Sequence, residues 1–162
     1  MNDKYLTEID QNKVEKIISD SIGWALTKDI NRLFSIVAQD EDFFICHPDS
    51  KSTTLGFEAF QQLGERMWLT NAFRATDFAI RELRVNFSTT GTVAWYSAYL
   101  DDHAEWNGKP GGWDNVRWTG VIEKRVDRWV IVQMHFSFAT DSMQAEMVKG
   151  DSTIHNTREI YG

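Results

Sequence analysis

Hydrophobic residues recur with a helical period along the first forty residues of the chain. The series has the three- and four-residue spacing of one helix face: Val14, Ile17, Ile18, Ile22, Ala25 and Leu26. Asp10 is a candidate cap for the start of this helix, and a second short helix is expected to begin near Asp29. The same period returns over 55–68 and predicts a third helix. A short apolar strand is expected at 42–46, before it.

The period changes to two from Ala72 onward, which predicts β-strands. The first strand changes parity partway, and one β-bulge near Arg81 or Glu82 reconciles its two halves. Turns are expected at 88–92 and around Val126 and Asp127. Further strands are expected at 93–101, 113–124 and 129–138, and the glycine-rich segment 103–112 is expected to be a long loop.

Helices followed by a run of strands predict an α+β fold. N-terminal helices would pack on a strongly curved antiparallel sheet and enclose a pocket. A chain of 162 residues fits one domain. We expect this domain to span 1–140 and the polar segment 141–162 to form a C-terminal tail.

Three polar residues, Gln133, His135 and Ser137, share one parity of the otherwise apolar strand WVIVQMHFSF at 129–138. They can face solvent, line an interior pocket, or form a buried hydrogen-bonded cluster. Neighbouring strands carry a similar mixture on one parity: Trp95, Ser97, Tyr99, Asp101, Asn115, Arg117 and Thr119. Aromatic area with a few polar groups is typical of a cavity wall. We therefore favour a polar face inside the pocket and an apolar outer face that forms a homodimer.

Composition narrows the classes of function. The formal charge of −7 argues against a nucleic-acid partner, which requires a basic surface. Cys46 is the only cysteine and the four histidines are scattered, so neither an internal disulfide nor a metal site is expected. No signal peptide pattern opens the chain, and no apolar run approaches the roughly 20 residues that span a bilayer. A cytoplasmic protein without a membrane partner is expected.

The segment VRWTGVIEKRVDRWVIVQMHFS, 116–137, resembles the closing hairpin of SnoaL-like domains in the nuclear transport factor 2-like superfamily. The matching residues are Arg117, Thr119, Lys124, Arg125, Trp129, His135 and Ser137. The association domain of calcium/calmodulin-dependent protein kinase II is similar, and the likeness covers roughly 10–139. One departure is Val126-Asp127-Arg128, where these hairpins often carry a glycine.

This resemblance implies a cone-shaped α+β fold with a deep pocket and a dimer formed through the outer sheet face. The superfamily contains isomerases, polyketide cyclases, dehydratases and non-catalytic association modules. The fold alone therefore does not select a function.

Acid–base chemistry in such a pocket needs a group that transfers a proton and a donor that stabilises an oxyanion. His135, Asp101 and Tyr99 are the candidate catalytic residues. Arg117 is a candidate partner for a ligand carboxylate or enolate, although both Arg117 and His135 also fit purely structural roles. The predicted ligand-binding residues are Arg117, Gln133, Ser137, Trp95, Trp68, Asn115 and Thr119.

Two functions stay open at this point. The first is a protein that binds a small apolar or anionic molecule and acts on it, without a cofactor, as an isomerase, cyclase or dehydratase. The alternative is a non-catalytic association or ligand-sensing module that dimerises.

Overall fold

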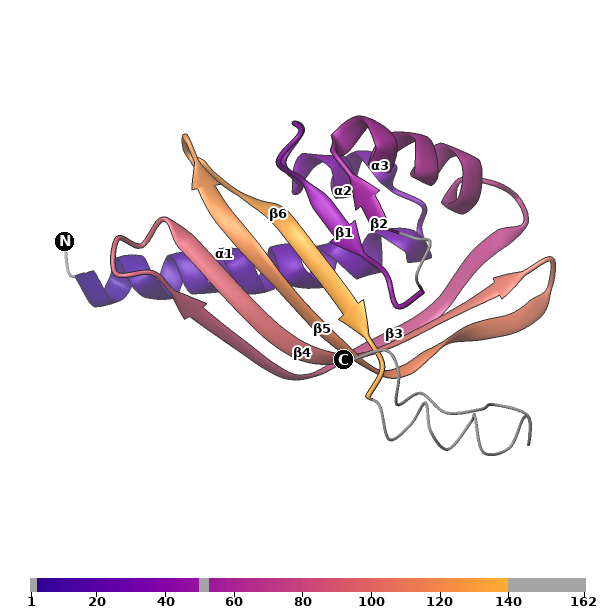
Figure 1. Ribbon diagram of the computed structural model, residues 1–162. Helices are drawn as coiled ribbons and strands as arrows, with labels where there is room; N and C mark the ends of the chain where they lie inside the picture. Colours follow the sequence, from indigo (N-terminus) through magenta and orange to yellow (C-terminus); the bar gives the residue numbers. More distant parts are fainter. Residues whose placement is uncertain (1–2, 50–52, 140–162) are drawn as a thin grey trace, which may run out of the picture.

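The computed structural model describes residues 3–49 and 53–139 (Figure 1). Its helices are α1 (Asp3–Gly23), the short 3₁₀-helix η1 (Trp24–Leu26), α2 (Ile30–Ser35), α3 (Phe57–Leu63) and the π-helix η2 (Gly64–Trp68). Its strands are β1 (Phe44–Cys46), β2 (Thr53–Leu55), β3 (Phe73–Phe87), β4 (Val93–Trp106), β5 (Lys109–Arg125) and β6 (Arg128–Ser137). The tail expected over 141–162 lies outside the described residues.

The strands form one sheet in the order β2-β1-β6-β5-β4-β3. All pairs are antiparallel except β1 with β6, which is parallel. The sheet is curved, α1 runs across one of its faces, and α2 and α3 lie near its β1–β2 end (Figure 1). The predicted α+β fold, with helices first and a largely antiparallel sheet after them, is confirmed.

The helix starts were predicted with mixed success. Asp29 caps α2, because its side chain accepts a hydrogen bond of 3.0 Å from the backbone N–H of Arg32. Asp10 is not a cap, since α1 begins seven residues earlier, at Asp3. Its carboxylate instead accepts hydrogen bonds from Trp129 Nε1 at 3.1 Å and Lys124 Nζ at 2.9 Å. It therefore joins α1 to the β5–β6 hairpin.

The bulge predicted in the first long strand is confirmed. The pairing of β3 with β4 shifts between Arg81 and Arg84, and Glu82 has a positive φ of 52°. The turns at 88–92 and at Val126-Asp127 are also confirmed.

The long loop predicted over 103–112 is wrong. Strand β4 continues to Trp106 and β5 starts at Lys109, so the connection is only Asn107-Gly108. Both residues have positive φ, 50° and 76°, as in the type I′ turn that suits a two-residue hairpin. The short strand β2 was not predicted at all.

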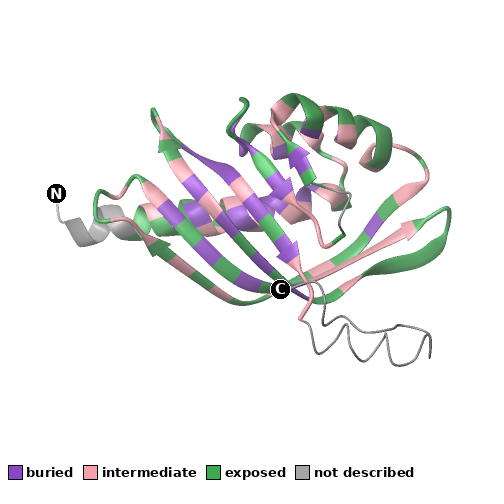
Figure 2. Cartoon of the chain, viewed as in Figure 1, coloured by how far each residue is buried: buried purple, intermediate pink, exposed green. Residues whose placement is uncertain are grey.

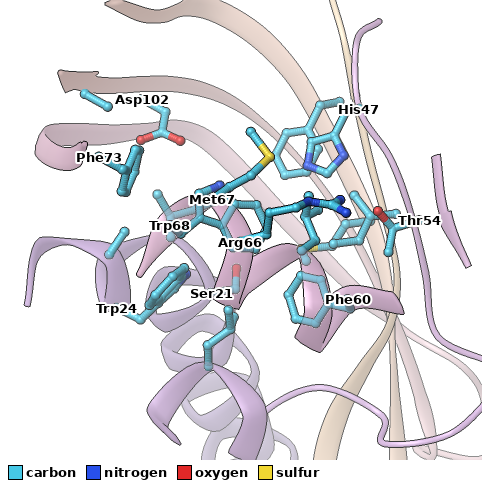
Figure 3. Close-up of a pocket in the computed structure, with 18 of the residues that line it drawn as sticks. Ser21, Trp24, His47, Thr54, Phe60, Arg66, Met67, Trp68, Phe73 and Asp102 are labelled. Atoms are coloured by element: carbon cyan, nitrogen blue, oxygen red, sulfur yellow. The ribbon is translucent and has the colours of Figure 1, made fainter. Parts of the chain in front are cut away.

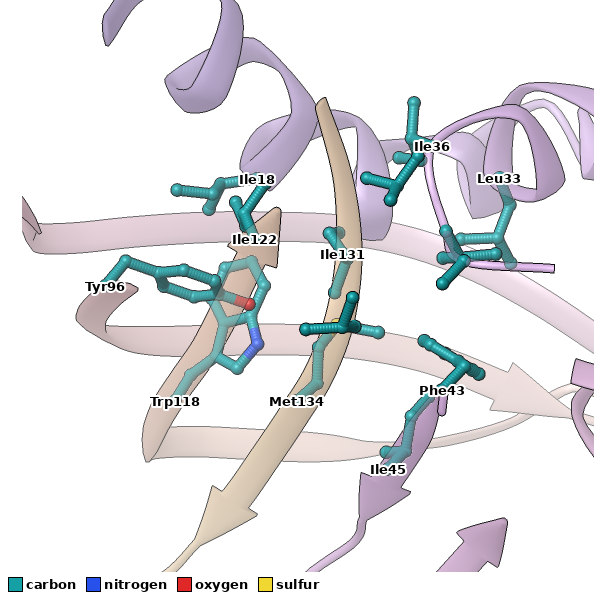
Figure 4. Packing of buried hydrophobic residues seen from close by; sticks show 14 of the residues in the cluster. Ile18, Leu33, Ile36, Phe43, Ile45, Tyr96, Trp118, Ile122, Ile131 and Met134 are labelled. Carbon is teal, nitrogen blue, oxygen red and sulfur yellow. The ribbon is translucent and has the colours of Figure 1, made fainter. Parts of the chain in front are cut away.

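A hydrophobic core lies between the helices and the inner face of the sheet (Figure 4). Figure 2 shows buried and exposed residues alternating along much of β4 and β5, so each of these strands has one face inside. The bulkiest fully buried side chains include Ile18, Leu33, Phe43, Ile45, Phe60, Leu100, Trp118, Ile122 and Ile131. Burial of each such side chain contributes about 1.5–3 kcal/mol to folding.

The predicted orientation of the last two strands is wrong. Trp118, Met134 and Phe136 are buried on the inner face, whereas Arg117 and His135 are exposed on the outer face. The apolar face of the sheet packs against the chain's own helices, because both then bury their apolar side chains in one core. The mixed aromatic and polar face is therefore the outer face of the sheet.

A bulge in β6 explains the odd pattern of WVIVQMHFSF. Val121 pairs with Gln133 but the next residue, Ile122, pairs with Ile131, so Val132 is an extra residue in β6. The alternation restarts after Val132. Trp129 and Ile131 before the bulge, and Met134 and Phe136 after it, therefore all lie on the buried side.

Candidate functional site

A cavity of about 820 Å³ lies between the helices and the inner face of the sheet (Figure 3). Its volume is in the range of small-molecule sites. The α1–η1 junction, α3, η2, the β1–β2 hairpin and the long strands all contribute lining residues. Several aromatic side chains form part of the wall: Trp24, Phe60, Trp68, Phe73, Trp106, Trp113 and Phe136.

Ring contacts fix the helical part of this wall. Trp68 packs edge-on against Trp24, with ring centroids 5.8 Å apart, and against Phe60 at 5.7 Å. Such edge contacts stabilise aromatic pairs beyond simple burial. These contacts hold the three rings in place and give this side of the wall an aromatic surface.

The π-helix η2 places consecutive side chains on the cavity. Leu69 donates its backbone N–H to the carbonyl of Gly64 at 3.0 Å, which closes the wider turn. Arg66, Met67 and Trp68 all line the cavity as a result.

Asp102 is the carboxylic acid that β4 contributes to the cavity, beside Phe73 (Figure 3). Burial raises the pKa of its carboxyl from 3.8 to about 6, and the neighbouring His103 charge acts in the opposite direction. Among the described residues, burial and the His103 charge are the two causes of this pKa shift, and no hydrogen bond contributes to it. A desolvated acid of this kind is suited to proton transfer near neutral pH.

Another bulge shapes the wall opposite Asp102. Leu100 pairs with Val116 but Asp102 pairs with Trp113, so β5 has one residue more than β4 over this stretch. Asn115, within the bulge, has a φ of 56°. The parity of β5 changes here, and Trp113 faces the cavity together with its partner Asp102.

Further polar residues line the cavity: Ser21, His47, Asp49, Thr53, Thr54, Gln62 and Arg66. The His47 ring is stacked on Phe136, with centroids 5.7 Å apart and planes at 11°.

No group of three or more metal-ligating side chains occurs among the described residues. Likewise, no helix within 3–49 and 53–139 is long and apolar enough to cross a membrane.

Of the predicted site residues, Trp68 lines this cavity and the others do not. The remaining candidates lie on the outer face of the sheet or at its edge: Trp95, Tyr99, Asp101, Asn115, Arg117, Thr119, Gln133, His135 and Ser137. Tyr99, Arg117 and Thr119 border a shallow outer hollow of about 260 Å³. The prediction that these side chains face the enclosed pocket is wrong, because the apolar face of the sheet is the one that faces the helices.

Asp101 is held in an environment opposite to that of Asp102. Its carboxylate accepts a hydrogen bond of 2.8 Å from the backbone N–H of Asn115 and one of 2.7 Å from the Arg81 guanidinium. The bond from Asn115, followed by the pairing with Arg81, lowers the pKa of the Asp101 carboxyl. A carboxylate stabilised in its ionised form is a poor base, so its geometry lends no support to a catalytic role.

Sequence reasoning missed Asp102, Arg66 and His47. Asp102 shares its parity with the buried Ala98 and Leu100, and this signal would have identified it once the apolar face was taken as the inner one. No comparable signal marked Arg66, because the π-helical turn that directs it is not visible in the hydrophobic pattern.

Comparison with known proteins agrees with the resemblance of the terminal hairpin. Residues 14–141 match the family described as the SnoaL-like domain. No curated protein is detectably similar in sequence.

Several solved structures share the fold. One is a candidate scytalone dehydratase from Novosphingobium aromaticivorans, with a TM-score of 0.68 and 14% identity over 84% of this chain and 87% of that one. Another is the association domain of C. elegans CaMKII, with a TM-score of 0.62 and 16% identity over 85% of this chain and 100% of that one. A third is an NTF2-like protein of unknown function from Prochlorococcus, with a TM-score of 0.63 and 16% identity over 90% and 99%.

Proposed function

Because this chain belongs to the SnoaL-like domain family, we propose that its cavity binds a small, largely apolar molecule and transforms it by acid–base chemistry. Asp102 is the residue that moves the proton. The observation that carries the proposal is a desolvated carboxyl, with its pKa raised to about 6, inside an aromatic cavity. The likeness to a candidate scytalone dehydratase favours the same class of chemistry.

Asp102 has the acidity that this reaction needs. With a pKa near 6 it is mostly ionised at pH 7, yet it is a stronger base than an ordinary carboxylate. It would take a proton from a carbon next to a carbonyl and leave an enolate. Returning that proton to another carbon completes an isomerisation. Expulsion of a β-hydroxyl group, with the proton passed from Asp102 to the leaving oxygen, completes a dehydration.

The aromatic wall supports this chemistry by placing apolar surface around Asp102. Trp24, Phe73 and Trp106 offer flat surfaces for a ring-shaped substrate. The partly buried Asp102 carboxylate is less well solvated than an exposed one and therefore accepts a proton more readily.

Titration of the carboxyl groups by carbon-13 NMR tests the base directly. The Asp102 signal, identified by its loss in Asp102→Asn, should titrate near pH 6, while the Asp101 signal titrates below the ordinary range. A probe ketone, 2-tetralone, should exchange its α-hydrogens with D₂O faster in the presence of the wild-type protein than with Asp102→Asn. An Asp102 signal at an ordinary carboxyl pKa, with equal exchange rates, would refute the proposal.

A second candidate function is that of an association module. Trp95 and Tyr99 remain 45% and 37% exposed on the outer sheet face. In the described part of the chain, Arg84, Arg117 and Glu82 beside them have no ion pair. We infer that two copies meet through this face, and the likeness to a CaMKII association domain favours the same idea. In that case the cavity would sense a ligand rather than transform it.

A further inference from the structure

Arg66 gives the cavity a cationic end. Among the residues that the structure describes, Arg66 is the only lysine or arginine in the cavity wall. It lies on η2 beside Met67 and Trp68. Asp102 contributes a carboxylate to the same cavity from β4. A ligand in this space therefore meets groups of opposite charge, separated by aromatic surface.

Arg66 has no acidic partner within the described residues. Four other arginines do: Arg32 with Asp20, Arg74 with Glu105, Arg81 with Asp101, and Arg125 with Asp40. His47 and Asp49 also line the cavity, but each has an interaction partner of its own. The Arg66 guanidinium is thus available to an incoming anion, and its planar set of N–H donors matches a carboxylate.

Thr54 adds a hydroxyl group at the same place. Its side chain is on the inner side of β2, with 8% exposure, and it lines the cavity. Figure 3 shows the Thr54 hydroxyl and the Arg66 guanidinium turned toward one another at the end of the cavity where His47 lies. A threonine hydroxyl both donates and accepts, so it can complete the coordination of an anionic oxygen.

We propose that the ligand of this cavity is a flat, ring-containing molecule with a carboxylate group, which Arg66 and Thr54 bind. This inference rests on the proposed function in that it assigns the substrate class of the same cavity. The aromatic wall holds the rings. The Asp102 carboxylate repels the anionic group, which orients the molecule with its carboxylate toward Arg66 and its uncharged part toward Asp102.

Two probes that differ in charge test the inference. 2-Naphthoate and 2-naphthamide have the same ring system, and only the first is an anion. Titration calorimetry at pH 7.5 should give a roughly tenfold lower Kd for 2-naphthoate, as expected for a charge-assisted pair with arginine. Raising the salt concentration should weaken this preference, because Arg66 is exposed to solvent.

Substitutions test whether Arg66 and Thr54 cause the preference for 2-naphthoate over 2-naphthamide. Arg66→Gln should bind the two probes equally, and Thr54→Val should reduce the difference. Arg128→Gln is the matched control, because Arg128 is exposed, lies outside the cavity wall, and donates only a long 3.4 Å bond to the Ser35 carbonyl. Its preference should equal that of the wild type.

Asp102→Asn separates this inference from the proposed function. The variant should keep its preference for 2-naphthoate even though it cannot transfer a proton. Loss of exchange chemistry with retained preference supports both ideas, and an unaffected exchange rate with retained preference removes only the catalytic role. If the wild type binds both probes equally, or if Arg66→Gln keeps the preference, the carboxylate site is refuted.

Discussion

Two neighbouring aspartates, Asp101 and Asp102, show how strand alternation sets the chemistry of single residues. Consecutive side chains of β4 point to opposite faces of the sheet. Asp101 therefore meets Arg81 and the backbone of Asn115 outside, while Asp102 enters an apolar cavity. Identical side chains acquire pKa values shifted in opposite directions.

The stability of the protein should report this difference. Asp102 holds its proton more tightly in the folded than in the unfolded state, so wild-type stability falls as the pH rises from about 4 to about 6. Asp102→Asn should raise the free energy of unfolding by about 2–3 kcal/mol at pH 7, and by little at pH 4. Urea denaturation across this range measures the effect.

Asp101→Asn is the matched control for this experiment. Its carboxyl pKa is lowered in the folded state, so the ionised form stabilises the fold above the unfolded pKa. The same Asp→Asn change should therefore destabilise at pH 7. If both substitutions change the free energy of unfolding in the same direction at pH 7, the environments assigned to Asp101 and Asp102 are contradicted.

The sequence identified the four long strands, although it missed β2 and made β4 and β5 too short, and it placed the wrong face of the sheet inside. The mixture of Trp95, Tyr99 and Arg117 looked like a cavity wall by composition. The alternation of a strand defines two faces, and only the position of the helices decides which one is covered. The long strands line the cavity from the apolar face, where Asp102 lies beside Ala104, Trp106 and Trp113.

At the scale of elements, whether a bulge can be predicted depends on what surrounds it. The β3 bulge was visible because apolar residues occupy opposite parities on its two sides, as in Ile80 and Leu83. The β6 bulge was hidden, since Val130 and Val132 extend an apolar run across the change of parity. Asn107-Gly108, in contrast, was a readable hairpin signal, and the glycines that follow it made it resemble a loop.

The turn between β5 and β6 holds a valine in an unfavourable backbone conformation. Val126 has a φ of 54°, a region that β-branched residues strongly disfavour, and its side chain is 94% exposed. Val126→Asn should therefore raise the free energy of unfolding by about 1 kcal/mol, because asparagine tolerates this conformation. The melting temperature should rise by about 2–4 °C, measured by circular dichroism.

Val121→Asn provides the comparison for this turn. Val121 lies within β5, partly buried and paired with Trp95 and Gln133. The same change of side chain should destabilise there, because asparagine is disfavoured in strands. A lower melting temperature for Val126→Asn would show that the turn is not strained.

At the scale of the whole molecule, the helices cover one face of the sheet and leave the other open. The outer face combines exposed aromatic rings with arginines and hydroxyl groups, in rows such as Arg84, Ser97, Thr119 and His135. A face of this composition resembles the core of a protein interface, where Trp, Tyr and Arg are enriched. The homodimer predicted from the sequence thus stays a prediction. Its contact would involve the mixed aromatic and polar face of the sheet, and not the apolar face expected from the sequence.

Substitution of an outer-face aromatic residue tests the dimer. Light scattering at micromolar concentration should give twice the chain mass of 18.8 kDa for the wild type. Trp95→Arg should give the mass of a single chain, because the change removes an exposed aromatic ring and adds a positive charge to a face that already carries Arg84 and Arg117. Leu26→Arg is the control, since Leu26 is similarly exposed, at 47%, but lies on η1, away from the outer face. A single-chain mass for the wild type, or an equal effect of both substitutions, would exclude association through this face.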